Sequence, residues 1–298
     1  MKSSAQQVWF NIAVTDGLGP AAGQKIARYL ASHQLPVDAL LDYTIEQLQS
    51  TGVTIGVAQA MHQQLHDLIT LPDPLNEIEL ATPGEDHYPN ARLEGANPPL
   101  PLVMWAAADR ALLNSSSPTL AIAGSRETTE ELLEVVYDVA KHASRQGWLI
   151  VSGLAAGVDS AGHQGGLDGG TGTIGVLASG ITNTSRSWTA DTSEGICYVS
   201  QFAPTDPWSG PRAMQRNSTI AALADRVFVA VAGTSGGSWE MAQLCLKRKK
   251  QLFVLDVPSD IAPGNEKLIR AGATPLDPAN TEPAIAAPPP PSPLTLFG

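Results

Sequence analysis

The sequence predicts an α/β fold in which a mostly parallel sheet carries helices on both faces and follows a small all-helical module. Apolar runs typical of fully buried parallel strands occur at 119–123, 149–151, 173–177, 226–231 and 252–257. Small-residue turns and helical stretches separate these runs, as βαβ units require. The hydrophobic fraction is 43% but the aromatic fraction is only 5%, so an aliphatic core of the kind found in parallel sheets is expected.

The composition bounds the class of function. The 298 residues carry a formal net charge of -11, which argues against a protein that coats nucleic acid nonspecifically but is compatible with a local basic groove. Cys197 and Cys245 lie far apart in the sequence, and their spacing is not that of metal ligands. We therefore expect both to be reduced core residues of a cytoplasmic protein, and we expect no metal and no cofactor. No run of 18 apolar residues occurs, and we expect neither a signal peptide nor a membrane span.

Residues 1–70 are expected to form the helical module. Short helical periods flank a Gly-x-Gly-Pro turn at 17–20, which is similar to a helix-hairpin-helix (SAM-like) element. The amides of such a hairpin can bind a DNA phosphate, but Lys25 and Arg28 are opposed by Asp16, and a packing module is the favoured interpretation. Residues 71–99 are expected to be a linker with a short strand at 78–81. The main domain follows at 100–277, with an edge strand at 100–105.

The first buried strand ends in a phosphate-compatible corner. Gly124-Ser125-Arg126 follows the strand at 119–123 and precedes a long helix expected at 130–146. The glycine allows close backbone approach, while the hydroxyl and the guanidinium can bind phosphate oxygens. The alternative is that Arg126 only pairs with a carboxylate such as Glu127 or Glu130.

The stretch 149–181 reads as strand, glycine-rich turn, short helix and strand. Ser152-Gly153 ends its first strand, Gly157 precedes the helix, and Gly180 follows the second strand. Small residues at the carboxyl end of a strand let a phosphate reach the amides of the next helix, although they also make tight turns.

Two more features point to an anion. Arg212, Arg216 and Asn217 are expected just before a helix, where they would meet an anion or a carboxylate. A third small-residue corner at 233–238 follows the strand at 226–231. Four cations at 247–250 are expected at the C-terminus of the next helix. There they would interact either with the helix dipole, which favours positive charge at that end, or with a nucleic acid.

Together these motifs resemble the DprA/Smf (DNA-processing protein A) family over roughly residues 120–275, and the helical module matches the family's usual preceding module. The resemblance implies an extended Rossmann-like domain that binds single-stranded DNA, forms a homodimer and acts with a RecA-type recombinase in recombination or transformation. The expected DNA- or nucleotide-binding residues are Gly124, Ser125, Arg126, Ser152, Gly153, Gly157, His163, Gly180, Arg212, Arg216, Asn217, Gly236, Gly237 and Ser238. One departure is Ser218, which stands where the family usually has a second arginine.

An enzyme is the alternative. The lysine-decarboxylase-like phosphoribohydrolases belong to the same superfamily, and Arg216 with Glu240 resembles their catalytic pair on a nucleotide. Their glutamate lies further past the glycines, so a non-catalytic DNA-binding protein is favoured over a phosphoribohydrolase or a nucleotide sensor.

Residues 278–298 are rich in proline and are expected to be a disordered tether with an apolar tip. Leu294, Leu296 and Phe297 resemble the short Leu-x-Leu-Phe peptides that dock into the bacterial sliding clamp, which makes the clamp a candidate partner. Alternatively, the tip folds back onto its own domain.

Overall fold

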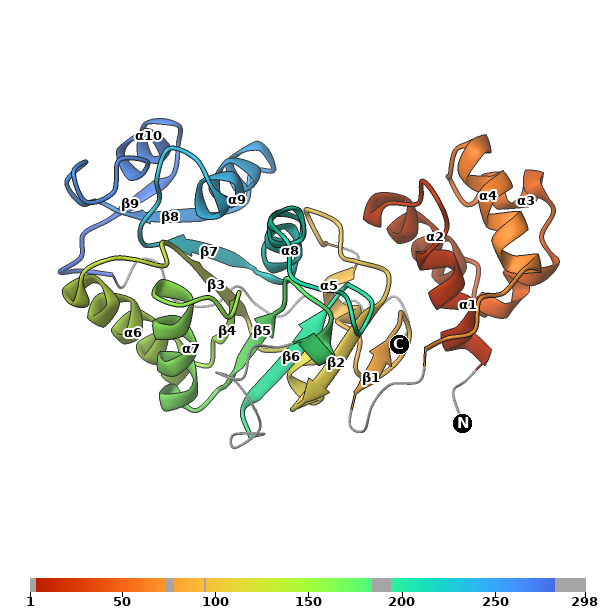
Figure 1. Cartoon of the computed structure of the whole chain (residues 1–298), viewed down its shortest axis with the longest axis horizontal. Coiled ribbons are helices and arrows are strands. Elements are labelled where there is room, and N and C mark those ends of the chain that lie inside the picture. Colours follow the sequence, from red (N-terminus) through yellow and green to blue (C-terminus); the bar gives the residue numbers. More distant parts are fainter. Residues whose placement is uncertain (1–3, 73–77, 94, 184–193, 282–298) are drawn as a thin grey trace.

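The computed structural model describes residues 4–72, 78–93, 95–183 and 194–281. A helical module stands at one end of the molecule, beside the sheet domain (Figure 1). Its helices are α1 (Ser4–Ala13), α2 (Pro20–Ser32), α3 (Ile45–Ser50) and α4 (Ile55–His66). Pro20 begins α2, a position where its fixed φ is already helical and no amide is needed. Thr44 and Thr54 cap α3 and α4.

One nine-stranded sheet forms the main domain, in the order β1-β2-β6-β5-β4-β3-β7-β8-β9. Only β2 runs antiparallel to its neighbours, β1 and β6, among the described pairs. The strands are β1 (Glu79–Ala81), β2 (Met104–Ala108), β3 (Thr119–Ala123), β4 (Leu149–Ser152), β5 (Thr173–Val176), β6 (Ile196–Ser200), β7 (Arg226–Val229), β8 (Leu252–Leu255) and β9 (Thr274–Leu276). The expected mostly parallel sheet is confirmed.

Helices cover both faces of this sheet, as expected (Figure 1). Leu120 and Ile122 of β3 pack in a cluster with α6 (Glu130–Arg145) and α7 (Val158–Gly169). Ala121 and Ala123 point the other way, into a cluster with α8 (Gly210–Leu223), α9 (Gly237–Lys247) and α10 (Asn265–Arg270). Side chains of one strand alternate between faces, so a continuous apolar run supplies both cores.

The prediction of an edge strand at 100–105 is wrong, both in the residues that form the strand and in its place at the edge of the sheet. The strand begins at Met104 and pairs on both sides, with β1 and β6, whereas β1 forms the edge. Pro101 lies within the expected range and has no amide to donate to a ladder, so the chain stays irregular there although Leu100 and Leu102 are buried.

Part of the segment expected to be a linker lies within the fold. It supplies β1 and the short helix α5 (Asn90–Leu93), and Tyr88 is fully buried with its hydroxyl donating to Pro101 O at 2.8 Å. At the opposite edge, β9 was not predicted. None of the described helices combines the length and the apolarity needed to cross a membrane.

The strand order sets the position of the site. From β3 the chain moves to β4, β5 and β6 on one side, and then returns to β7, β8 and β9 on the other. The loops that leave β3 and β7 therefore diverge, and in open α/β sheets a crevice forms at this point, outside the carboxyl ends of the strands.

Candidate nucleic-acid interface

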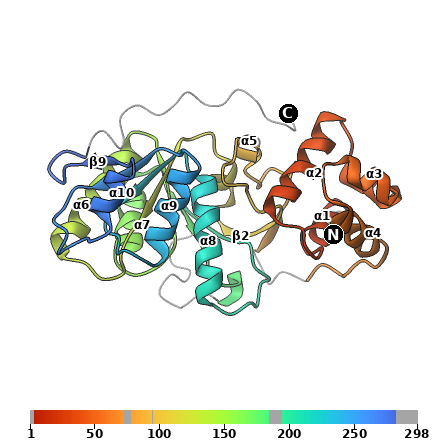
Figure 2. The ribbon, with the colours of Figure 1, turned by 90° about the horizontal axis from the view of Figure 1, so that it is seen from above.

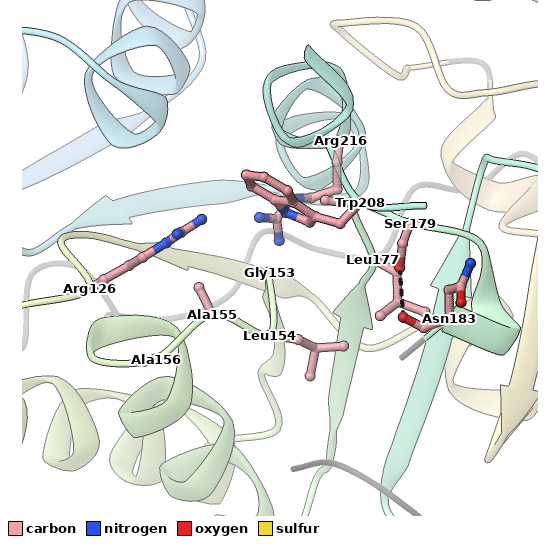
Figure 3. Close-up of a pocket in the computed structure, with 11 residues that line it drawn as sticks. Arg126, Gly153, Leu154, Ala155, Ala156, Leu177, Ser179, Asn183, Trp208 and Arg216 are labelled. Atoms are coloured by element: carbon pink, nitrogen blue, oxygen red, sulfur yellow. Dashed lines mark hydrogen bonds between the residues drawn. The ribbon is translucent and has the colours of Figure 1, made fainter. Parts of the chain in front are cut away.

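Two adjoining cavities lie at this edge of the sheet. The larger, of about 610 Å³, follows β3 and β7 and is bounded by the N-terminus of α9. The smaller, of about 330 Å³, follows β4 and β5 (Figure 3). Arg126, Ala155, Trp208 and Arg216 line both, so the two cavities form one continuous recess.

Arg216 is the buried cation of the recess. Its Nη1 donates to Val176 O at 3.0 Å, and the residue is only 6% exposed. The expectation that Arg212, Arg216 and Asn217 precede a helix is wrong, because all three lie inside α8. Ser209 caps that helix, its hydroxyl accepting from the Arg212 amide, so the helix begins earlier than the arginines suggested.

Gly153 leaves room for the Arg216 guanidinium, and Asp159 balances its charge. A methyl group at Gly153 would lie 1.6 Å from Arg216 Nη1 and 2.6 Å from Asp159 Oδ2, so both groups occupy the space above this glycine. Burial raises the pKa of Asp159, and the Arg216 charge opposes that shift. Burial also lowers the pKa of Arg216, opposed by Asp159. The glycine at the end of β4 is thus required by two side chains rather than by a turn.

Arg126 is the exposed cation of the recess. It leaves the carboxyl end of β3, and its Cζ lies 5.9 Å from the centre of the Trp208 ring. Among the described ion pairs, none joins Arg126 to Glu127 or Glu130, which were the alternative partners. Repulsion from Arg126 adds to the lowering of the Arg216 pKa, so the two cations act on each other across the recess.

The N-terminus of α9 faces the larger cavity. Gly237 and Ser238 line it, and Gly236, with φ of 92°, is an N-cap without a side-chain hydrogen bond. Asn217 Nδ2 donates to Gly237 O at 3.1 Å, and Ser238 Oγ donates to Gly124 O at 2.9 Å. These bonds tie the first and third small-residue corners together beside an uncapped helix end, which favours an anion.

The N-terminus of α7, where the central stretch was expected to bind phosphate, is used differently. The Val158 amide donates to Ser125 O at 3.2 Å. Gly157 has φ of 75°, and a methyl group on it would lie 2.5 Å from Arg126 O. These residues pack the second corner against the first, so the helix end open to a ligand is that of α9.

Several expected site residues lie behind the recess or beside it. His163 is fully buried, and its Nδ1 donates to Thr173 Oγ1 at 2.7 Å, since that hydroxyl donates to Ile150 O. Burial lowers the pKa of His163 to about 3, which keeps the ring neutral at physiological pH. Ser152 is buried with its hydroxyl donating to Ile122 O at 2.6 Å.

Three others line neither cavity. Gly180 packs against the following loop, where a methyl group would lie 2.1 Å from Ala203 O. Arg212 pairs with Asp206 at 3.0 Å. Glu240, the carboxylate of the enzyme alternative, is exposed on α9. The structure therefore brings together Gly124, Ser125, Arg126, Gly153, Arg216, Asn217, Gly237 and Ser238, and leaves the others as support.

Three residues that line a cavity were not predicted as site residues, namely Trp208, Leu154 and Asp159. Trp208 offered a signal, because a tryptophan in a polar, proline-containing loop is unusual in a chain with 5% aromatic residues. No group of three or more potential metal-ligating side chains occurs in the part of the chain that the structure describes. Leu294, Leu296 and Phe297 lie outside that part.

A family profile and the sequences of known proteins match this chain, and they point to the same family. Residues 79–284 match the profile of the family described as DNA recombination-mediator protein A. The DNA processing protein DprA of Bacillus subtilis is 32% identical over 184 residues, which cover 58% of this chain and 60% of the relative. Protein Smf of Synechocystis is 24% identical over 292 residues, covering 92% of this chain and 70% of the relative.

Solved structures show the same fold. DNA processing protein A from Streptococcus pneumoniae matches 93% of this chain and 95% of its own, with a TM-score of 0.68 at 20% identity. The protein of the same name from Helicobacter pylori matches 58% of this chain and 81% of its own, with a TM-score of 0.51 at 24% identity.

Proposed function

The chain belongs to the DNA processing protein A family, and from this premise we propose that it binds single-stranded DNA along the recess that holds Arg126 and Arg216. The observation that carries the proposal is the convergence of these two arginines, from the end of β3 and from α8, beside the open N-terminus of α9. Positive charge and unsatisfied amides at one edge are what a phosphate backbone requires.

The charge of the cavity lining supports this proposal although the chain as a whole is acidic. The chain has a formal net charge of -11, but Asp159 is the one acidic residue among the described residues that line the two cavities. Asp159 is itself buried beside Arg216, which leaves the exposed Arg126 to face solvent. The Helicobacter pylori relative was solved for its single-stranded DNA binding mode, which favours the same class of ligand here.

The enzyme alternative receives less support from the geometry. A phosphoribohydrolase-like reaction would pair Arg216 with Glu240 as acid or base. Arg216 lines both cavities, whereas Glu240 lines neither. We therefore propose binding without catalysis. A homodimer, cytoplasmic action, a RecA-type recombinase and, through the C-terminal tail, the sliding clamp are further proposals from the resemblance.

Fluorescence anisotropy with a labelled single-stranded oligonucleotide, measured at several salt concentrations, tests the proposal. Arg126→Ala should weaken binding and lower the slope of log affinity against log salt by about 0.7, because one phosphate contact is lost. Arg126 is the better variant because it is exposed, whereas loss of Arg216 would also leave Asp159 buried without its cation.

Arg145→Ala is the matched control, since Arg145 is an exposed arginine in the last turn of α6, away from the cavity-lining residues. We expect it to bind as the wild type does. Wild-type protein that does not bind the oligonucleotide, or an Arg126→Ala variant with unchanged affinity and slope, would contradict the proposal.

A further inference from the structure

Two histidines of the helical module face each other in the second half of α4. His62 and His66 are four residues apart, a spacing that puts both side chains on one face of a helix. Their Nε2 atoms lie 3.2 Å apart, and His66 is exposed while His62 is half-buried. Neither residue lines the recess, and α4 lies in the outer part of the helical module, away from the sheet domain (Figures 1 and 2). The pair is therefore separate from the candidate nucleic-acid interface.

The distance between the two nitrogens fits a shared metal ion. Zn²⁺ binds imidazole nitrogen at about 2.0–2.1 Å in tetrahedral geometry, so two histidine nitrogens on one zinc ion lie about 3.3 Å apart. The ring centres of His62 and His66 are only 4.4 Å apart, so the two rings do not point at each other along one line. A strong N–H···N hydrogen bond prefers such a straight approach, whereas two ligands of one metal ion meet it at an angle.

The fold holds the end of this helix in place. Asn11 of α1 is fully buried, and its Oδ1 accepts hydrogen bonds from Gln64 Nε2 and from the Ile69 amide, both at 2.8 Å. Leu65, which lies between the two histidines in the sequence, is buried as well. Helix ends ordinarily fray, but these contacts fix the turn that carries both imidazoles. Little order therefore has to be gained when a metal ion binds there.

The charges around the pair favour a cation. Helix α4 ends at His66, and the helix dipole attracts positive charge at its C-terminus. Between Arg28 and Arg92 the sequence contains no lysine or arginine but nine acidic residues, one of which, Asp67, directly follows the pair. A divalent cation thus meets little opposing charge from this part of the chain.

We propose that His62 and His66 form a chelating site for a zinc-class divalent metal ion, with water in the remaining coordination positions. Imidazole nitrogen suits Zn²⁺, Ni²⁺ and Cu²⁺, whereas Mg²⁺ and Ca²⁺ prefer oxygen ligands. The ion joins two residues that are one helical turn apart, so it binds the folded helix more tightly than the unfolded chain and stabilises the helical module. This site is independent of nucleic-acid binding.

Isothermal titration calorimetry of the untagged, full-length protein with ZnCl₂ tests the site. His62→Gln and His66→Gln should each weaken Zn²⁺ binding at least about tenfold, since replacing even a hydrogen-bonding partner of a metal ligand has an effect of that size. Amide hydrogen exchange of residues 62–67 should slow when ZnCl₂ is added to the wild type, and should stay unchanged in either variant. MgCl₂ should leave both measurements unchanged.

The double variant Gln63→His with His66→Gln is the matched control. It keeps the number of histidines in α4 but places them at adjacent positions, which do not face each other on a helix. Gln63 is exposed, so the exchange does not disturb the core. This double variant should bind Zn²⁺ as weakly as His66→Gln does. His33→Ala, which removes another exposed histidine of the module, should bind as the wild type does.

Two outcomes would overturn the site. One is wild-type protein that binds no Zn²⁺. The other is a double variant that binds Zn²⁺ as tightly as the wild type, because binding would then not depend on the facing pair. Neither outcome bears on the binding of single-stranded DNA, which is measured separately with the oligonucleotide.

Discussion

Replacing Gly153 with alanine is a stringent test of how the recess is built. The added methyl group would lie 1.6 Å from Arg216 Nη1, 2.4 Å from its Cζ and 2.6 Å from Asp159 Oδ2. No side chain tolerates such contacts, so the guanidinium must leave its place. Its hydrogen bond to Val176 O is then lost, and Asp159 stays buried without its cation.

The cost follows from these contacts. Leaving a buried charge without the opposite charge that lies near it costs up to about 3–5 kcal/mol, because that charge stays in a poorly solvated site. We expect Gly153→Ala to lower the free energy of unfolding by that amount in urea titrations followed by circular dichroism. Adding Asp159→Asn should recover part of the loss, since the stranded charge is removed.

Gly56→Ala provides the matched control, because a methyl group there has no atom within 4 Å and Gly56 lies in a helix. It should be neutral or stabilising by about 0.5–1 kcal/mol. A Gly153→Ala protein that unfolds within about 0.5 kcal/mol of the wild type would show that Arg216 and Asp159 do not depend on this space.

Two further predictions concern buried polar groups behind the recess. The pKa of His163 is lowered from 6.5 to about 3 in the folded chain, so the unfolded chain binds the proton more readily. The contribution of His163 to the free energy of unfolding should therefore be fully present above pH 6.5. As the pH drops from 6.5 toward 3, the free energy of unfolding should fall by up to about 1.4 kcal/mol per pH unit. His163→Gln should flatten this part of the pH profile of the unfolding free energy, and parallel profiles would contradict the assignment. Asn265 is fully buried and bonds the backbone of Ala230, Ala232 and Leu255 at 2.8–2.9 Å, so Asn265→Ala should cost about 3 kcal/mol in urea titrations. Asn280→Ala, at an exposed loop position, should cost little, and equal effects of the two variants would refute this role.

Much of the fold could be predicted from the sequence because its signals are local. Apolar runs of four or five residues gave β3, β4, β5, β7 and β8, since strands buried on both faces need apolar side chains at every position. The amphipathic stripe from Glu130 gave α6. The strand at 100–105 failed because Pro101 outweighs the hydrophobicity of its neighbours.

The candidate site was predicted in part for the same reason. Gly-Ser-Arg after β3 and Gly-Gly-Ser at the start of α9 were identified because small residues next to a strand end or at a helix start leave backbone amides accessible. These corners do meet in one recess, together with Arg216.

The sequence alone determined which segments are buried strands and which corners expose backbone. Only the tertiary structure decided which corner stays open, because an amide is satisfied by whichever carbonyl the fold brings near. Ser125 O accepts a hydrogen bond from the Val158 amide at the start of α7, whereas α9 has no side-chain cap and its N-terminus borders the larger cavity. The tertiary structure likewise brought the charges of Arg216 and Asp159 near each other and placed Trp208 in the lining of both cavities. Such neighbours come from segments distant in the chain, so no local pattern encodes them.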